Sequence, residues 1–243
     1  DPFNFLVKYK NVFPKYKDLS WISLSNSQRS GMPTDTNWVA NIYHGLDKDT
    51  FTPIDVPSNN YIAYLGRIIE PKGVHIAIKA VQHFNKTADI PLILKIAGKH
   101  YAEHSKDTYW STHVEPFLGH EIEYIGHIKS DSEKRQFLGN ARALLVPSIF
   151  DEPFGMVTIE ALACGTPVIG LDRGATHEII DNGATGYVIP YINDSDAVAA
   201  ISETLQDIDN LNRKDCRISF EKRFTSDRMA SDHAHLYESL VIK

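Results

Sequence analysis

The sequence predicts an α/β protein built on a parallel β-sheet that is covered by helices on both faces. Two observations support this prediction. From Tyr61 onward, short apolar runs of strand length alternate with helical segments, and this alternation is typical of parallel sheets. Within that region, residues 142–170 give a complete strand, loop, helix and strand, with Gly165 just past the end of the helix.

The beginning of the chain does not form a compact unit of its own. Phe3–Tyr16 has apolar residues at helical spacing, and short strands are expected at Ser20–Leu24 and Trp38–Tyr43. These elements are too few to make a sheet by themselves. Residues 47–60 contain prolines and several polar side chains, so they are expected to be a linker.

The regular region supplies the sheet and its covering helices. The expected strands are Tyr61–Leu65, Leu92–Ala97, Ile122–Ile125, Leu144–Pro147, Val168–Leu171 and Tyr187–Ile189. The expected helices are Val74–Phe84, one within Ser105–Leu118, Ser130–Asn140, a central helix ending before Gly165, Asp194–Gln206, Asn212–Arg223 and Ser226–Val241. Ligands of such sheets bind at the carboxyl ends of the strands, so the loops that follow the strands are the places to search.

The composition argues against several classes of function. The 243 residues are 42% hydrophobic and 23% charged, with a net charge of −6, as in ordinary globular proteins. The negative charge argues against a nucleic-acid-binding face, and no apolar run approaches the ~20 residues of a membrane span. The 11 histidines and 2 cysteines form no zinc-like quartet, so no metal site is expected.

The cysteines concern the cellular location of the protein, and the first residue concerns the extent of the chain. Cys164 lies in the apolar central helix and is expected to be a buried free thiol, which favours a cytoplasmic location. The chain starts at Asp1 without Met, which we take to indicate a fragment.

Two glutamates eight positions apart bracket the start of the central helix. Glu152 lies on the loop that leads into it, and Glu160 lies in its early turns among apolar residues. A lone buried carboxylate is costly unless it is paired, and one such Glu could simply cap a neighbouring loop. However, helix N-termini attract anions, phosphate above all. Two carboxylates around an anion site suit a ligand that carries both phosphate and hydroxyl groups.

A second loop, Gly66–Gly73, follows the first strand of the regular region and carries Arg67 and Lys72. It lacks both the Gly-Lys-[Ser/Thr] ending of a Walker loop and the Gly-x-Gly-x-x-Gly pattern of dinucleotide oxidoreductases. An Arg fork and a Lys point charge at the mouth of a sheet suit a pyrophosphate. The alternative is a surface loop with solvated charges.

Both loops resemble motifs of one family. Glu152-Pro-Phe-Gly followed by Glu160 and by Ala-x-x-x-Gly-x-Pro-Val resembles the signature of the family 4 retaining glycosyltransferases, which have the two-domain GT-B fold. Residues 66–73 resemble that family's Gly-Arg-x-x-x-x-Lys-Gly phosphate loop. The resemblance implies a Rossmann-like C-terminal half that binds a nucleoside diphosphate sugar, with a UDP-sugar as the expected donor and no further cofactor.

The resemblance also implies roles for individual residues. Glu152 would contact the hydroxyls of the donor sugar, Glu160 the ribose hydroxyls, and the backbone amides of residues 154–157 the sugar and phosphates. Glu152, Arg67 and Lys72 are therefore the expected catalytic residues. The expected donor-binding positions, all of which come after Asn60, are Gly66, Arg67, Lys72, His127, Ile128, Glu152, Phe154, Gly155, Met156, Val157 and Glu160.

Some of these positions act in other ways or depart from the family pattern. His127 and Ile128 would hold the base through backbone groups, and Lys134 can also reach the nucleotide. His44 stands where the family has Asn. Residues 174–178, Gly-Ala-Thr-His-Glu, stand where the family often has Gly-Gly-x-x-Glu, and Ala175 replaces the second Gly, which puts close backbone approach there in doubt.

The implied domain division is a remnant of the N-terminal acceptor domain at residues 1–46, the linker at 47–60, the nucleotide-sugar-binding domain at 61–225 and a crossover helix at 226–243. Two segments, Trp38–Gly45 and Gly73–Ala80, show a weaker resemblance to a bacterial subgroup that includes pterin and antibiotic glucosyltransferases.

The expected function is transfer of a hexose, with retention, to an unknown acceptor. Because the acceptor domain is largely missing, the chain alone is expected to be inactive and to self-associate through residues 1–46. The alternatives are a nucleotide-sugar epimerase of GT-B fold and a non-catalytic nucleotide-sugar-binding module.

Overall fold

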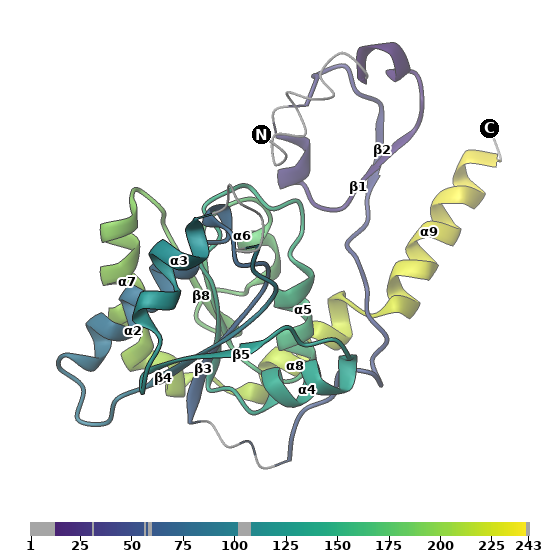
Figure 1. Ribbon diagram of the computed structural model, residues 1–243. Helices are drawn as coiled ribbons and strands as arrows, with labels where there is room; N and C mark the ends of the chain where they lie inside the picture. Colours follow the sequence, from purple (N-terminus) through teal and green to yellow (C-terminus); the bar gives the residue numbers. More distant parts are fainter. Residues whose placement is uncertain (1–12, 31, 56, 58–59, 102–107, 242–243) are drawn as a thin grey trace.

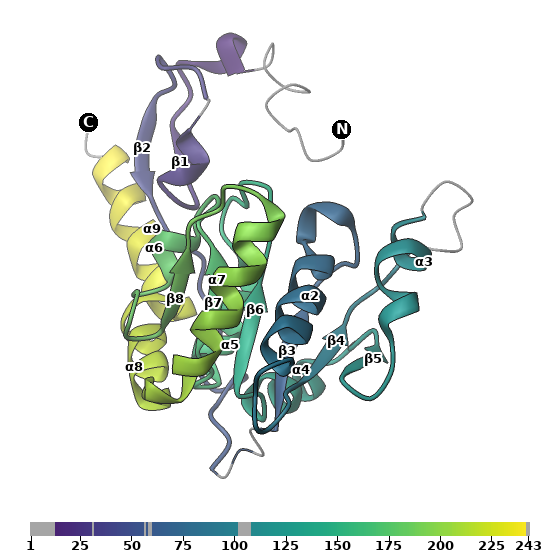
Figure 2. The ribbon, with the colours of Figure 1, turned by 90° about the vertical axis from the view of Figure 1, so that its left-hand side faces the viewer.

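The computed structural model describes residues 13–30, 32–55, 57, 60–101 and 108–241 (Figure 1). Its central feature is a six-stranded sheet of order β5-β4-β3-β6-β7-β8, in which every neighbouring pair is parallel. Helices cover both faces of this sheet (Figure 2). The predicted α/β class with a Rossmann-like parallel sheet is confirmed.

The strands of the sheet agree with the predicted ones to within one residue at each end. They are β3 (Tyr61–Leu65), β4 (Ile93–Ala97), β5 (Ile122–Gly126), β6 (Ala143–Val146), β7 (Val168–Leu171) and β8 (Gly186–Ile189). Successive side chains of a strand point to opposite faces, so Ile62 and Tyr64 enter one core while Tyr61 and Ala63 enter the other.

Two hydrophobic cores therefore flank the sheet. On one face lie α2 (Val74–Asn85), α7 (Asp194–Asp207) and α3 (Tyr109–His113). On the other lie α4 (Asp131–Gly139), α5 (Met156–Ala163) and α8 (Arg213–Arg223). The central helix α5 is buried from Thr158 to its end, as its apolar sequence predicts.

The two cysteines are free and buried in the second core. Burial raises the pKa of the Cys164 and Cys216 thiols to about 12 each, so both are protonated near neutral pH. The prediction of a buried free thiol at Cys164 is confirmed.

Two short helical segments were not predicted. The helix predicted within Ser105–Leu118 is present as α3, which ends at His113 and is followed by a separate 3₁₀ turn at Glu115–Phe117. Pro116 has no N–H for an α-helical hydrogen bond, which explains the break. The short helix α6 (Thr176–Ile179) was not predicted, and it lies directly after the Gly174 turn.

The N-terminal segment lies apart from the main sheet. Its strands β1 (Trp21–Ser23) and β2 (Trp38–Asn41) are shorter than predicted. They nevertheless pair as a two-stranded parallel sheet, so the expectation that this segment makes no sheet by itself is wrong. Short 3₁₀ turns occupy Phe13–Tyr16 and Ser27–Arg29, and most of the helix predicted at Phe3–Tyr16 lies outside the described residues.

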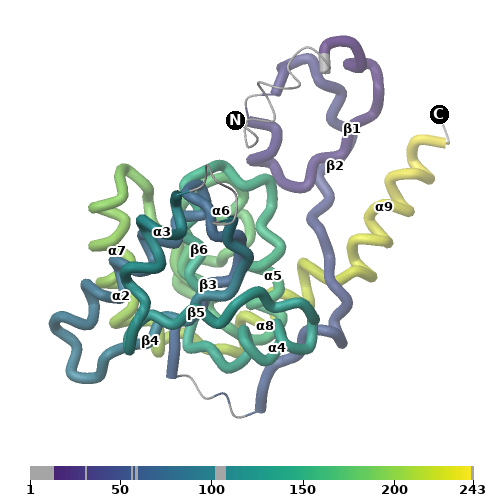
Figure 3. Tube along the Cα trace, viewed as in Figure 1, coloured from purple at the N-terminus to yellow at the C-terminus, as the bar shows by residue number. Residues whose placement is uncertain are grey.

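Two connections run side by side between this segment and the rest of the chain. The Leu46 N–H donates to Phe224 O (2.9 Å), and the Ser226 N–H donates to Leu46 O (2.8 Å). From there α9 (Ser226–Val241) extends towards the level of β1 and β2 (Figures 1 and 3). Among the helices in the described ranges, none is long and apolar enough to cross a membrane.

Candidate functional site

Two loops meet at the carboxyl ends of the central strands β3 and β6. The Ile149 N–H in the loop after β6 donates to Pro71 O in the loop after β3, at 2.9 Å. Gly73 has φ +68°, and a Cβ atom there would lie 1.9 Å from Pro147 O. Only glycine allows this approach, so Gly73 fixes the two loops against each other.

The strongest contact between the loops is an ion pair. Lys72 Nζ lies 2.7 Å from Glu152 Oε1, with the two side chains 14% and 21% exposed. The hydroxyl of Ser148 lies 3.4 Å from the other carboxylate oxygen, Oε2. Lys72 Nζ is also 5.1 Å from the centroid of the Phe150 ring. The basic and acidic residues that sequence analysis had placed in separate motifs are thus direct partners.

A small cleft opens beside this pair at the carboxyl edge of the sheet. Its lining residues come from the ends of β3 and β6, from both loops and from α5: Tyr64, Leu65, Lys72, Leu145, Val146, Pro147, Ser148, Glu152 and Val157. Three of the predicted positions, Lys72, Glu152 and Val157, therefore share one surface.

Arg67 and Gly66 lie on the same edge in a rigid backbone setting. The Tyr64 hydroxyl donates to Arg67 O (2.9 Å), and the Gly66 N–H donates to Ala97 O (3.0 Å) at the end of β4. Gly98 packs directly on Gly66, since a Cβ atom there would lie 1.7 Å from Gly66 O. The Arg67 side chain itself is exposed.

Glu160 is buried in α5 and has a partner on α4. It is 8% exposed, and its Oε1 atom accepts a hydrogen bond from Lys134 Nζ at 3.0 Å. Burial raises the pKa of the Glu160 carboxyl, and the Lys134 charge offsets part of this effect. Burial acts to lower the pKa of Lys134, but Glu160 and Asp131 outweigh it, and that pKa is raised. The partner that a buried carboxylate requires is therefore Lys134, which sequence analysis had considered only as a contact to a nucleotide.

The turn between Glu152 and α5 joins the site to the N-terminal segment. Gly155 has φ +104° and precedes the first residue of α5, Met156. The side chain of Phe154 is buried against Tyr43 and His44, at ring-centroid distances of 5.9 and 5.2 Å. Phe154 thus contributes its ring to a core and keeps only its backbone at the site.

His127 and Ile128 lie further along the same edge, after the outermost strand β5. His127 is exposed, and Ile128 packs partly against the second core. The Gly98 N–H donates to Gly126 O at 2.9 Å, which joins this loop to the end of β4. The predicted loop positions therefore follow β3, β5 and β6 at the carboxyl edge of the sheet, although His127 and Ile128 are separated from Lys72 by the width of β4.

A third loop, residues 172–175 before α6, packs on the backbone of Glu152. The Ala175 N–H donates to Glu152 O at 3.0 Å. A Cβ atom on Gly174 would lie 2.2 Å from Glu152 O, and its φ is +55°. The close backbone approach that was in doubt at position 175 is therefore present, because the buried Ala175 donates its N–H to Glu152 and Gly174 beside it leaves no room for a side chain.

Glu178 of α6 contacts the N-terminal segment, and it was not among the predicted site residues. Its carboxylate accepts hydrogen bonds from the backbone N–H groups of Asn26 (2.8 Å) and Ser27 (2.6 Å) and from the Tyr43 hydroxyl (3.0 Å). The family pattern Gly-Gly-x-x-Glu around Gly174 marked this position, but nothing in the sequence named its partners.

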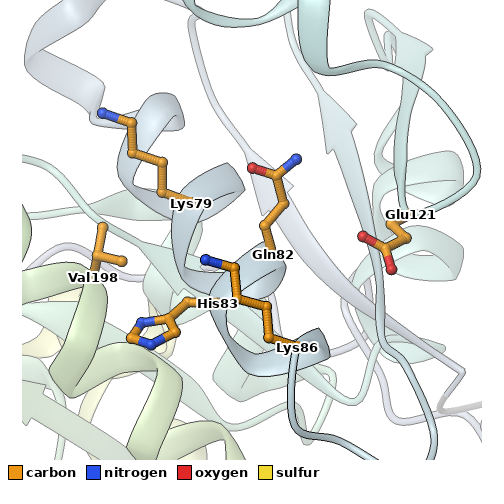
Figure 4. A pocket seen from close by; sticks show the side chains of 6 residues that line it. All are labelled: Lys79, Gln82, His83, Lys86, Glu121 and Val198. Atoms are coloured by element: carbon orange, nitrogen blue, oxygen red, sulfur yellow. The ribbon is translucent and has the colours of Figure 1, made fainter.

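A second hollow lies elsewhere, between the later part of α2, the segment before β5, and α7 (Figure 4). It is lined by Lys79, Gln82, His83, Lys86, Glu121 and Val198. It contains none of the predicted site residues. Because α2 runs back from the carboxyl edge, this hollow lies towards the amino ends of the strands.

The described residues contain no group of three or more His, Cys, Asp or Glu side chains that could hold a metal ion.

Comparison with known proteins adds independent information. A family model described as "Glycosyl transferases group 1" matches residues 50–218, which is more than half of the chain. A protein of Bacillus subtilis described as "Putative glycosyltransferase YtcC" is 26% identical over 222 residues, covering 82% of this chain and 54% of the relative. The chain spans about half the length of this curated relative.

Solved structures share the fold. Sucrose-phosphate synthase from Thermosynechococcus elongatus aligns with a TM-score of 0.75 and 23% identity over 92% of this chain and 58% of that protein. Anabaena Alr3699/HepE, solved in complex with UDP and glucose, aligns with a TM-score of 0.77 and 18% identity over 98% of this chain and 69% of that one. At these identities the likeness shows the fold alone.

Proposed function

The chain belongs to the group 1 glycosyl transferases, and on that basis we propose that its carboxyl-edge site binds a nucleoside diphosphate sugar as donor for hexosyl transfer with retention at the anomeric carbon. The proposal takes the chain as the donor-binding half of a family 4 enzyme of GT-B fold. A UDP-sugar is the proposed donor, and no further cofactor is required.

The observation that carries the proposal is the Lys72–Glu152 pair beside the start of α5. One loop brings a cation and the other a carboxylate to the same cleft, with Nζ and Oε1 2.7 Å apart. The N–H groups of the first turn of α5 follow directly, and helix N-termini favour phosphate. A ligand that carries both phosphates and hydroxyls matches all three features.

Charge balance indicates how the donor would engage this pair. The diphosphate would attract Lys72 and the exposed Arg67. It would replace Glu152 as the anionic partner of Lys72. The Glu152 carboxylate would then accept hydrogen bonds from the sugar hydroxyls. As the bond from the anomeric carbon to the diphosphate breaks, the two cations and the α5 N-terminus would stabilise the charge of the departing group.

Glu160 would hold the ribose. A carboxylate can accept hydrogen bonds from two neighbouring hydroxyls, and it does so best when it is ionised. Lys134, at 3.0 Å, keeps an ionised Glu160 compatible with its buried position. The base would lie further along the edge, near the backbone of His127 and Ile128, and the backbone amides of residues 154–157 would face the sugar and phosphates.

Three further statements belong to the proposal. The acceptor site lies in an N-terminal domain, so the chain alone would bind the donor without transferring it. The fully buried thiols of Cys164 and Cys216 suit a reducing compartment, and we place the protein in the cytoplasm.

The family assignment favours transfer over epimerisation. A purely binding module would share the donor contacts, and only an activity assay on a chain that includes the acceptor domain separates it from an enzyme.

Calorimetric titration of the chain with UDP-glucose, UDP-N-acetylglucosamine, GDP-mannose and ADP-glucose tests the proposal. We expect saturable binding of at least one nucleotide sugar, with UDP-sugars preferred, and the same affinity in EDTA. Failure of the whole panel to bind at millimolar concentration would contradict the donor site, and loss of binding in EDTA would contradict its metal-free character.

A further inference from the structure

The carboxylate of Glu178 on α6 accepts hydrogen bonds from several residues of the N-terminal segment. Its Oε1 atom accepts hydrogen bonds from the Ser27 N–H and the Ser27 hydroxyl, both at 2.6 Å. Its Oε2 atom accepts from the Asn26 N–H at 2.8 Å and from the Tyr43 hydroxyl at 3.0 Å. These donors are about 150 and 135 positions away in the chain. One side chain thus fixes the turn at residues 25–28 onto the main domain.

The same turn contacts the candidate site loop through Ser25. Its buried hydroxyl donates to Pro153 O at 2.6 Å and accepts from the Gln28 N–H at 3.0 Å. Both functions of the hydroxyl are therefore used, and its position depends on the turn that Glu178 holds. Pro153 lies directly between Glu152 and Phe154.

On its other side the site loop is held by the residues that lead into α6. The Ala175 N–H donates to Glu152 O at 3.0 Å, and Gly174 packs on the Glu152 backbone. The contacts therefore close a ring: Glu178 to the turn at residues 25–28, Ser25 to Pro153, Glu152 to Ala175, and α6 back to Glu178. The loop that carries Glu152 is one link of this ring and is held on both sides.

We infer that Glu178 is a positioning residue for donor binding, acting through the turn at residues 25–28 and Ser25 to hold Pro153, and with it the Glu152 carboxylate, in the arrangement that receives the donor sugar. This inference rests on the proposed function of the Glu152 loop. It assigns to the N-terminal segment a part in the donor site, beyond any contact with an acceptor.

A role limited to attaching the N-terminal segment makes a different prediction. In that case, loss of the Glu178 contacts would lower stability and loosen residues 25–28, but the loop at 151–155 would keep its shape through Gly174 and Ala175. A positioning role requires the loop itself and its ligand affinity to change. It also requires Ser25, which does not contact Glu178 in the ring, to have the same effect on affinity.

The variants for the test are Glu178→Gln, Ser25→Ala and the double variant. Matched controls are Glu203→Gln on α7 and Ser231→Ala on α9, which make the same chemical changes at exposed positions. Tyr43→Phe is a milder variant, since it removes one hydrogen bond to Glu178 and keeps the ring against Phe154. It serves if Glu178→Gln does not fold.

Two measurements on the full chain are combined. Calorimetry gives the UDP-glucose affinity, and hydrogen exchange followed by mass spectrometry gives the protection of the peptides that contain residues 151–155 and Ala175 without any ligand. We expect Glu178→Gln and Ser25→Ala each to weaken UDP-glucose binding by about fivefold to tenfold, comparable to loss of one hydrogen bond. We expect the double variant to be no weaker than the worse single variant, because both act through one path. Exchange in the loop should accelerate in all three.

Affinity and loop exchange equal to those of the two controls would overturn the positioning role, whatever the change in melting temperature. Additive losses in the double variant would also overturn it, because the two residues would then act separately. If the wild-type chain bound no nucleotide sugar, the proposed function would fail. Hydrogen exchange would then decide the inference alone, with faster exchange supporting the hold of Glu178 on the loop and unchanged exchange overturning it.

Discussion

Lys72 Nζ lies 2.7 Å from Glu152 Oε1, so an ion pair joins two loops that follow different strands at the carboxyl edge of the sheet. Both side chains are largely buried but line an open cleft, so a ligand entering the cleft can reach both charges. This pair is the basis of the proposed donor site, and the approach of the two loops that makes it possible depends on Gly73.

The first prediction concerns Gly73. Gly73→Ala should destabilise the chain by roughly 2–4 kcal/mol, because a side chain would have to displace Pro147 O and would be strained at positive φ. Urea denaturation measures the change in the free energy of unfolding. Gly119→Ala is the control, since a Cβ atom there meets nothing within 4 Å. Equal stabilities of the two variants would contradict the tight approach of the loops.

The second prediction concerns Glu160. Glu160→Gln should weaken UDP-glucose by about tenfold, the value of a charge-assisted hydrogen bond, and should leave free pyrophosphate nearly unchanged. The reason is that the Gln amide accepts less strongly from ribose hydroxyls, which pyrophosphate lacks. Calorimetry with both ligands makes the comparison. Equal losses for the two ligands would leave Glu160 with a structural role only, as the partner of Lys134.

The third prediction concerns pH and Glu178. Burial acts to raise the pKa of Glu178, but the hydrogen bonds from Ser27, Asn26 and Tyr43 outweigh it, and the pKa lies below its usual value of 4.5. A lowered carboxyl pKa contributes stability that is present above the unfolded value and is lost as pH falls through the folded value. The stability cost of Glu178→Gln should therefore be full at pH 7 and shrink below pH 4.5.

Denaturant titrations of the wild-type chain and of Glu178→Gln from pH 7 down to pH 3 measure this difference. A cost that stays constant over the range would show that the carboxylate charge does not stabilise the contact with residues 26 and 27. Glu160 provides the opposite case: burial raises its pKa, so its contribution to stability is lost as pH rises through that pKa.

The fourth prediction concerns self-association through the N-terminal segment. Apolar side chains in this part of the chain are exposed to solvent. Leu19, for example, is 56% exposed. Light scattering should show a mass that increases with concentration, and Leu19→Lys should reduce this increase. Ile192→Lys, at a residue that is 77% exposed before α7, is the control and should not. The same effect of both substitutions would exclude a specific role of residues 1–46.

Much of the fold was predictable from the sequence because the buried strands are short apolar runs with clear boundaries. Side-chain N-caps mark the starts of α4, α7 and α8, as in the capping box of Ser130 and Glu133. The prediction of a helix within Ser105–Leu118 left its end open, and Pro116 explains why α3 stops before the turn at Glu115–Phe117. The turn at Ser27–Arg29 and α6 meet through Glu178, a contact between positions distant in the sequence that local propensity does not contain.

The site was predictable as a set of residues but not as a set of contacts. Motif spacing identified Lys72, Glu152 and Glu160. Their partners come from pairing between loops and helices far apart in the chain, such as Lys134 with Glu160. The N-terminal segment was assigned no part in the donor site because every expected contact came after Asn60, whereas Ser25 contacts Pro153 and Tyr43 contacts Phe154.

The central claim is that Lys72 holds the diphosphate of a nucleotide sugar, and affinity for UDP compared with uridine in Lys72→Ala tests it most directly. Lys79→Ala, which removes the same charge from the exposed face of α2, is the control. We predict that Lys72→Ala weakens UDP by tenfold or more, as for loss of a charge-assisted contact of about 1.5–3 kcal/mol, and leaves uridine unchanged. An equal loss for UDP and uridine, or a UDP affinity like that of Lys79→Ala, would contradict the account.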